Sequence, residues 1–273
     1  MELSLIQNYE YFLSSLSPST RKTYDFVLRK FKVYLEGSGG SLERFSRSDV
    51  QTYLNALLSR NMAPSSVAKI YHAIRKWAKH ANLQQAVEEI RIPRPARLAD
   101  MPVKSLSRNE RNHLVREVER GGNIRDIAIV HLLLETGIRV MELVNLDLER
   151  VVIGERSGSI RVIGKQYKER IIPLPPDARY WLRKYMGERK EGPVFLSTRK
   201  SRVSVNTVQK MLSHYGVHPH MLRHTYCRTL VASGVDLATV ASLAGHADVN
   251  VTRRYAKPSE EEMGDLVEKA FSR

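Results

Sequence analysis

Apolar residues recur at helical spacing through most of this 273-residue chain, whereas residues 159–174 alternate around a turn. In the first hundred residues the helical spacing predicts three amphipathic helices. One follows Ser17-Pro18, the second is expected to be capped by Ser48, and the third opens at Pro64. Because no alternating segment interrupts them, these helices indicate a small bundle.

Residues 91–104 carry no apolar period. The segment RIPRPARLADMPV (residues 91–103) holds three prolines and three arginines, and proline biases its neighbours toward extended backbone. Structureless loops of this length are uncommon inside compact domains. We therefore expect a helical domain over residues 1–90, a basic linker over 91–104 and a second domain over 105–273. A long loop within one domain is the alternative.

The second domain mixes helices with a small sheet. Ser107 and Glu110 have the spacing of a capping box, which predicts a helix start. Residues 159–174 (SIRVIGKQYKERIIPL) alternate around a turn at 164–168 and predict a β-hairpin. Helical patterns return from about residue 175, and a short amphipathic helix over 259–271 must dock on a neighbouring surface. The predicted fold is mainly α, in two domains, with a small antiparallel sheet.

The charge of the chain favours a polyanionic partner. Lys and Arg outnumber Asp and Glu by 44 to 29, a formal net charge of +15, which favours nucleic acid before an anionic membrane. A highly charged, solvated surface is the alternative. The single cysteine, Cys227, excludes an intramolecular disulfide framework and a cysteine-based zinc site. The absence of a long apolar run and of a basic signal-peptide start predicts a cytoplasmic, DNA-associated protein without a membrane partner. The basic residues expected to contact DNA are Arg21, Lys22, Lys69, Arg75, Lys76, Lys79, Arg91 and Arg94.

Four short segments of the second domain concentrate polar residues. They are TGIRVMEL (136–143), GKQYKER (164–170), HMLRH (220–224) and LAGH (243–246) with Tyr255 nine residues further on. In the third segment, His220 and Arg223 share a helix face close to an N-terminus that Pro219 begins. A helix N-terminus attracts phosphate, and arginine adds a planar fork that matches two phosphate oxygens.

Each of these residues also has an ordinary structural interpretation. Arg139 sits in an apolar stretch, where a charge must be paired or face a ligand. Glu142 is its candidate salt-bridge partner, and the same contact is compatible with orienting Arg139 toward a phosphate. Taken singly, Lys165 fits a solvated turn lysine, His246 a helix-end cap and Tyr255 a core tyrosine.

In combination, the four motifs resemble the tyrosine recombinase (integrase) family, and the whole chain is similar to its two-domain, Xer-like members. The resemblance implies that Arg139 and Arg223 clamp the scissile phosphate and that Tyr255 is the nucleophile. The remaining catalytic positions that it implies are Lys165, His220 and His246. It implies no cofactor, and double-stranded DNA as the partner of a homotetramer on paired sites. Off DNA the chain is expected to be a monomer or dimer, with accessory proteins as further partners.

The chemistry that this family performs is transesterification. Tyr255 attacks a phosphodiester to form a 3′-phosphotyrosyl bond, and the energy of the broken bond is kept in the intermediate. Lys165 is our candidate acid for the departing 5′ oxygen, and His220 either accepts the phenol proton or holds the phosphate. No carboxylate cluster accompanies the motifs, so strand cutting is expected without a metal. The C-terminal helix docks either on its own domain or, as the resemblance suggests, on a neighbouring protomer.

Two other functions and one other site stay open from the sequence. A type IB topoisomerase-like enzyme uses the same tyrosine chemistry to relax DNA, and a non-catalytic DNA-binding protein is the second alternative. Four histidines, His214, His218, His220 and His224, raise the question of a zinc site. Pro219 prevents them from sharing one regular helix, so we expect no metal there.

Overall fold

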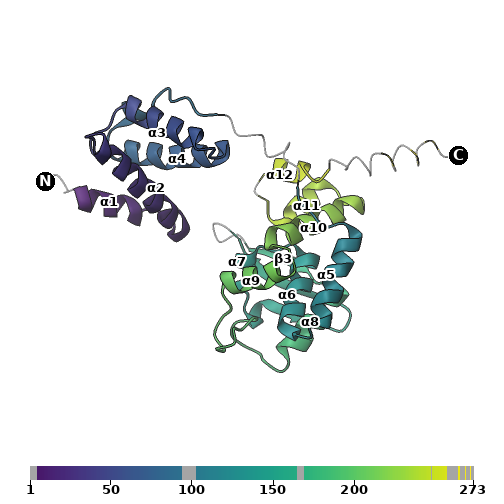
Figure 1. The fold of residues 1–273 in the computed structure, drawn as a ribbon. Helices are drawn as coiled ribbons and strands as arrows, with labels where there is room; N and C mark the ends of the chain where they lie inside the picture. The colour runs from purple at the N-terminus through teal and green to yellow at the C-terminus, as the bar shows by residue number, and fades with distance from the viewer. Residues whose placement is uncertain are drawn as a thin grey trace. The chain divides into compact units, whose positions relative to one another are not determined.

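The structure is a computed structural model that describes residues 5–93, 103–164, 169–246 and 248–256, together with Gly264, Glu268 and Phe271. The chain divides into two compact units, Met1–Arg97 and Leu98–Arg273 (Figure 1). Both units are mostly helical and the second contains a small antiparallel sheet, so the predicted fold class is confirmed. In the part of the chain described, no helix is long and apolar enough to cross a membrane.

The first unit is a helical bundle around Trp77, which is fully buried and donates its indole N–H to the Leu42 carbonyl at 2.9 Å. Its elements are α1 (Leu5–Ser14), α2 (Pro18–Gly37), α3 (Arg47–Ser59), α4 (Pro64–His80) and the 3₁₀ helix η1 (Gln84–Val87). Pro18 and Pro64 occupy the first turns of α2 and α4, as expected.

The predicted start of α3 was wrong by two residues. Ser46, rather than Ser48, caps the helix, because Asp49 lies three residues after Ser46 and completes a capping box. The Asp49 amide donates to the Ser46 hydroxyl at 3.2 Å, and the Ser46 amide donates to the Asp49 carboxylate at 2.7 Å. These reciprocal bonds provide partners for the backbone N–H groups of Ser46 and Asp49 at the start of the helix.

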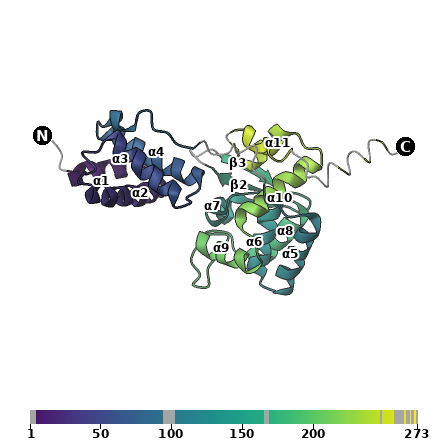
Figure 2. The ribbon, with the colours of Figure 1, turned by 45° about the horizontal axis from the view of Figure 1, so that its top comes forward.

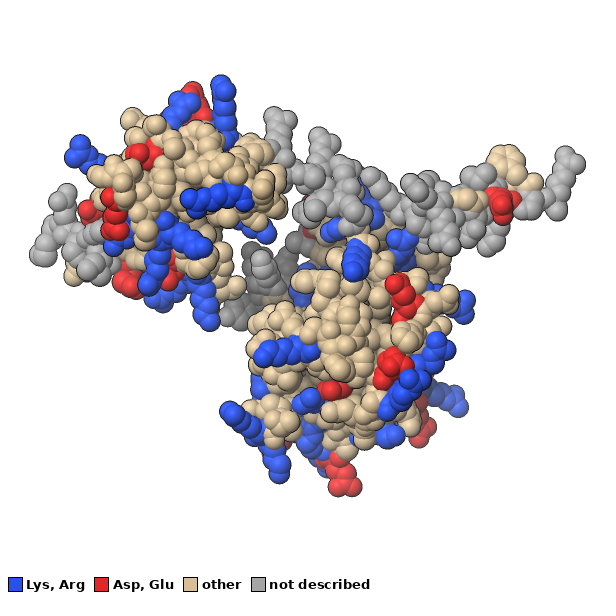
Figure 3. Space-filling model, viewed as in Figure 1, with Lys and Arg blue, Asp and Glu red and all other residues tan. Residues whose placement is uncertain are grey.

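The basic residues proposed to contact DNA are exposed wherever the structure describes them. Arg21 and Lys22 lie on α2, and Arg21 pairs with Glu10 at 3.3 Å. The exposed basic residues of α4 are Lys69, Arg75, Lys76 and Lys79. Arg91 is also exposed, whereas Arg94 and most of the expected linker lie outside the described residues. Lys and Arg side chains are scattered over the visible face of each unit, with Asp and Glu among them (Figure 3).

The second unit is built around α6, which is buried along nearly its whole length. Its helices are α5 (Arg108–Arg120), α6 (Ile124–Thr136), α7 (Val140–Val144), α8 (Pro176–Met186), α9 (Val205–His214), α10 (Pro219–Ala232), α11 (Leu237–Ala244) and α12 (Asn250–Arg253), with the 3₁₀ helix η3 (Leu148–Arg150). Helices α5, α8 and α10 pack against α6 (Figure 1). Ser107 caps α5 through the predicted capping box with Glu110.

The predicted hairpin forms two strands of the sheet. Strands β1 (Val151–Ile153), β2 (Gly158–Ile163) and β3 (Glu169–Pro173) are antiparallel in the order β1-β2-β3, and Ile160 pairs with Ile172. Both side chains are fully buried, whereas the next residues along each strand are exposed. Strand β3 contacts α11, which brings the hairpin beside the later motifs (Figure 2). The predicted helix over 259–271 lies outside the described residues, apart from Gly264, Glu268 and Phe271.

Candidate active site

Two helices, α6 and α11, end at glycines, and the carbonyl groups at these helix ends bind two of the predicted arginines. Gly137 closes α6 at φ +60° and Gly245 closes α11 at φ +66°, left-handed conformations that favour glycine. The buried Arg223 donates to the carbonyls of Gly137 at 2.5 Å and Ala244 at 2.6 Å. Arg139 donates to the Gly245 carbonyl at 2.6 Å. Because the last carbonyls of a helix lack helical partners and carry partial negative charge, they attract both cations to the end of α11.

Glu142 contacts Arg139, as their spacing predicted. Arg139 is the residue before α7, and its backbone N–H donates to the Glu142 carboxylate at 2.7 Å. Its guanidinium donates to the other oxygen of that carboxylate at 3.0 Å. The Glu142 side chain is only 4% exposed and that of Arg139 is 38% exposed. The acid is therefore inside the protein, and the guanidinium keeps an outward edge that can meet a ligand.

A third arginine, which the sequence interpretation missed, completes this group. Arg170 on β3 donates both terminal nitrogens to the two oxygens of Glu142, each at 2.8 Å, and its Nε to the Leu243 carbonyl at 3.1 Å. A Cβ on Gly245 would lie 2.7 Å from the Arg170 guanidinium, so a larger residue there would displace this guanidinium. Arg170 pairs with Val162, a buried position of β2. This pairing, which places Arg170 on the buried face of the sheet, is the feature from which its role could have been predicted.

Two predicted histidines lie beside the arginines. His246 follows Gly245, and its Nδ1 shares a hydrogen bond of 2.8 Å with the hydroxyl of the buried Thr252. Burial and the nearby charges of Arg223 and Arg139 lower the pKa of His246 to about 4. For His220, on α10, loss of hydration and the Arg223 charge also lower the pKa. Both imidazoles are thus neutral near pH 7, and a ring N–H remains available to an anion.

Tyr255 lies two residues after α12 and its side chain points into the protein. The residue is 5% exposed and packs with Cys227, Val240 and Ala244. Its ring is nearly parallel to that of His246, at 11° and 6.3 Å between centroids. Burial raises the pKa of the phenol above its ordinary value, while the Arg223 charge acts in the opposite direction. The phenol is therefore protonated near pH 7.

The electrostatics of this site favour an anion. Burial and then the charge of Arg139 lower the pKa of the Arg223 guanidinium to about 10. The lowered pKa means that these surroundings destabilise the charged form of Arg223. Glu142 offsets part of the charge, but both its oxygens are already occupied by Arg139 and Arg170. A phosphate between the two predicted arginines would supply the missing negative charge.

The described part of the site brings together Arg139, Glu142, His220, Arg223, His246 and Tyr255. Lys165 lies outside the described residues. The strand end that precedes it borders a hollow of about 340 Å³, which Glu142, Arg161 and Gly164 help to line. His224 is a further histidine of the site, with its Nδ1 2.6 Å from the Tyr255 hydroxyl oxygen.

Comparison with known proteins decides the family. Residues 104–262 match the model described as the phage integrase family, and residues 6–85 match the phage integrase N-terminal SAM-like domain. The chain belongs to the phage integrase family. This integrase is 29% identical to the tyrosine recombinase XerD of Haemophilus influenzae, over 99% of this chain and 98% of that protein. It is 31% identical to the tyrosine recombinase XerA of Thermococcus onnurineus, over 97% of this chain and 95% of that protein.

Solved structures show the same fold. The site-specific recombinase XerH bound to its difH substrate has a TM-score of 0.73 at 17% identity, covering 98% of this chain and 85% of that chain. A lambda integrase dimer bound to a core site has a TM-score of 0.72 at 16% identity, covering 93% of this chain and 77% of that chain. The resemblance that the four motifs indicated is confirmed, and the integrase is a tyrosine site-specific recombinase.

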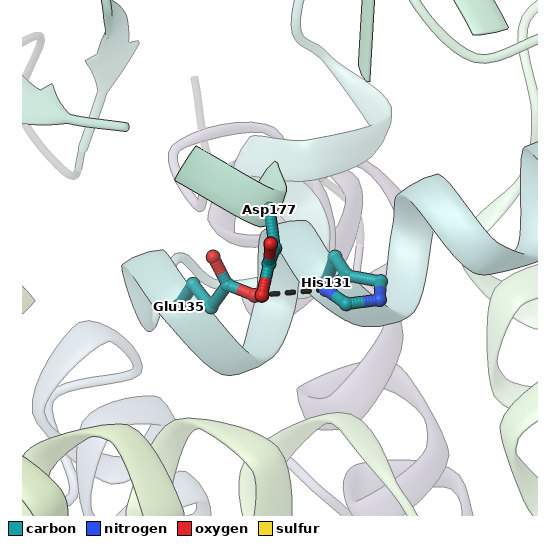
Figure 4. Close-up of side chains that lie close together, drawn as sticks. All are labelled: His131, Glu135 and Asp177. Carbon is teal, nitrogen blue, oxygen red and sulfur yellow. Dashed lines mark hydrogen bonds and ion pairs between the residues drawn. The ribbon is translucent and has the colours of Figure 1, made fainter. Parts of the chain in front are cut away.

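One group of metal-ligand side chains occurs among the described residues of the integrase, and it contains none of the predicted catalytic residues. His131 and Glu135 on α6 and Asp177 on α8 place one donor atom each within 4.8 Å of one another (Figure 4). Both ring nitrogens of His131 already face carboxylates, Nδ1 at 2.8 Å from Glu135 and Nε2 at 3.3 Å from Glu119. This geometry fits a doubly protonated ring that ties α5 to α6. The group contains none of the four histidines that the sequence analysis considered for zinc.

We expect His131 to make the stability of the integrase depend on pH. Burial opposes its charge, but the Glu135 and Glu119 carboxylates outweigh burial and raise its pKa. A raised folded-state pKa stabilises the protein fully below the unfolded value of about 6.5, and this contribution disappears as pH rises through the folded-state pKa. Urea unfolding across that range should show a flatter pH profile for His131→Gln than for the parent chain. The matched control is His113→Gln at an exposed position of α5, and identical slopes for both variants would contradict the prediction.

Proposed function

We propose that this integrase cuts and rejoins double-stranded DNA through a covalent bond between Tyr255 and a 3′ phosphate. The observation that supports this most directly is the meeting of Arg139, Arg223 and His246 at the end of α11, with the ring of Tyr255 stacked on His246. Guanidinium groups and a neutral imidazole are preorganised donors for the charge that develops on phosphoryl oxygens. The phenol of Tyr255 lies beside His246 and can act as the nucleophile.

In the proposed reaction the Tyr255 oxygen attacks phosphorus and the 5′ oxygen leaves. Arg139 and Arg223 hold the non-bridging oxygens, and His220 and His246 add hydrogen bonds. Lys165, which lies between β2 and β3 in the sequence, protonates the departing 5′ oxygen. A 5′ hydroxyl from the partner duplex then attacks the phosphotyrosine and releases Tyr255, so that strands are exchanged without loss of the bond energy.

The partners of this reaction follow from its chemistry and from the relatives. XerH and lambda integrase have been solved on DNA, and we propose that both basic units of this chain bind duplex DNA. The domain over 1–90 contacts it through the exposed residues of α2 and α4, and residues 91–104 connect it to the catalytic domain over 105–273. We further propose a homotetramer on paired sites in the cytoplasm, with residues 259–271 docked on a neighbouring protomer. The relatives named above are recombinases and integrases, and none of them favours relaxation or non-catalytic binding.

A suicide substrate tests this function directly. A nicked DNA site that loses its 5′ end after cutting should trap the integrase as a covalent adduct, and peptide mapping should place the DNA on Tyr255. We expect the same yield in EDTA, because arginines and histidines can carry the charge for which many nucleases use metal ions. An adduct that forms only with Mg²⁺, or that maps to another residue, would reject the proposal.

A further inference from the structure

The hydroxyl of Tyr255 contacts a histidine of the third motif, His224, to which the sequence analysis assigned no catalytic role. The Tyr255 hydroxyl lies 2.6 Å from Nδ1 of His224, the distance of a short hydrogen bond. The two rings are 5.7 Å apart at 46°. Among the hydrogen bonds of the described residues, none joins this hydroxyl to His220, the residue that the sequence analysis considered for the same role.

The position of His224 follows from helix geometry. Pro219 begins α10, and His220 and His224 are four residues apart, one turn along the same face. Their ring centroids lie 6.3 Å apart. Arg223, between them in sequence, donates to the carbonyls that end α6 and α11. One helix therefore carries a phosphate-binding cation and the group that touches the nucleophile.

The charge state of His224 suits a hydrogen-bond acceptor. Burial and the positive charges of Arg254 and other neighbours, including Arg223, lower the pKa of this imidazole to about 4. The ring is therefore neutral, and Nδ1 can accept the phenol O–H. An anion bound at Arg139 and Arg223 offsets part of the charge that opposes protonation of His224, so arrival of a phosphate makes the ring a stronger base.

We propose that His224 is a catalytic residue that takes the phenol proton when Tyr255 attacks, an inference that rests on the function proposed above. The O–H bond of Tyr255 breaks and its proton moves to Nδ1, while the oxygen–phosphorus bond forms. The bond from phosphorus to the 5′ oxygen breaks, and that oxygen takes a proton from Lys165. In the rejoining step the 5′ hydroxyl returns a proton to Lys165 and His224 returns one to the phenol. His220 is then left to bind the phosphate.

Two substitutions of His224 test the proposal. His224→Leu removes the acceptor, whereas His224→Asn keeps an acceptor oxygen near the position of Nδ1 but cannot take up a proton. Both variants should form the covalent adduct about 10²-fold more slowly at saturating protein, with unchanged affinity for the DNA site. His214→Asn, at an exposed position of α9, is the matched control and should keep the parent rate.

The outcomes separate a base from a residue that only holds the phenol in place. Recovery of the parent rate in His224→Asn would show that a hydrogen bond suffices, and it would overturn the proposal. A rate for His224→Leu within about twofold of the parent would do the same. These results leave the proposed function untouched as long as Tyr255→Phe forms no adduct, whereas an adduct in Tyr255→Phe would reject the function itself.

A modified substrate shows whether His224 acts on the attacking phenol or on the leaving 5′ oxygen. With sulfur in place of the bridging 5′ oxygen, the leaving group departs as a thiolate and needs no acid, because thiols are far more acidic than alcohols. This DNA should restore cutting by Lys165→Ala and leave His224→Leu slow. Restoration of His224→Leu would place the residue at the leaving group and overturn its assignment to the phenol.

Discussion

Replacing Tyr255 with phenylalanine is expected to abolish the covalent protein–DNA adduct while leaving the fold and DNA binding in place. Only the phenol oxygen is removed, and the ring keeps its packing against Val240 and Ala244. The lost hydrogen bond to His224 costs about 1 kcal/mol of stability. Denaturing gels after incubation with a suicide substrate measure the adduct, and gel shifts measure binding.

The control for this experiment is Tyr226→Phe. Tyr226 is also buried, at 8% exposure, and burial raises its pKa to about 12, yet its ring lies against Gly137 at the end of α6. It resembles Tyr255 in burial and protonation but is not hydrogen-bonded to His224 in the described residues. Tyr226→Phe should therefore form the adduct at the parent level. If the adduct persisted in Tyr255→Phe and vanished in Tyr226→Phe, the nucleophile would be Tyr226.

Much of the fold could be predicted because local patterns determine it. The capping box at Ser107 and the alternation of residues 159–174 each produced the expected element. Strand β1 was missed because three residues, Val151–Ile153, are too few to show a period. The predicted cap, Ser48, and the observed cap, Ser46, precede the same apolar stripe, and the reciprocal bond with Asp49 distinguishes them.

The site was predictable to the extent that its residues lie close in sequence. Arg139 and Glu142 are three residues apart, so their contact could be expected. Arg170 reaches the same carboxylate from 28 positions away, and a charged residue in an alternating strand usually faces solvent. The contact between His224 and Tyr255 spans 31 positions and depends on how α10 packs against the segment after α12. Such long-range contacts arise from packing, which a single sequence does not reveal.

The second large effect is expected from Glu142→Gln, on both the stability of the integrase and the rate of adduct formation. Its carboxylate accepts from the backbone and side chain of Arg139 and from both terminal nitrogens of Arg170. Burial opposes its ionisation, but Arg170 and Arg139 hold its pKa below the ordinary value, so the group is charged at pH 7. Glu142→Gln keeps the shape of the side chain and removes the charge that compensates the buried cations.

We expect Glu142→Gln to lower the free energy of unfolding by about 3 kcal/mol, because it leaves buried cations without their counter-charge. Arg139 also loses its orientation, and removal of one preorganised donor lowers a rate by about 10²–10³. Urea unfolding measures the first effect. Adduct formation on a suicide substrate, at a temperature where the variant is folded, measures the second.

The matched control is Asp147→Asn, which removes the acid of a more exposed pair with Arg202, whose side chains are 34% and 37% exposed. Water compensates a charge at such a position, so the expected loss is at most about 1 kcal/mol. Sulfate then distinguishes charge from packing. If Glu142 stabilises the site by compensating its arginines, an anion bound at Arg139 and Arg223 should raise the melting temperature of Glu142→Gln more than that of Asp147→Asn. Equal gains in sulfate would mean that the charge of Glu142 does not compensate these arginines.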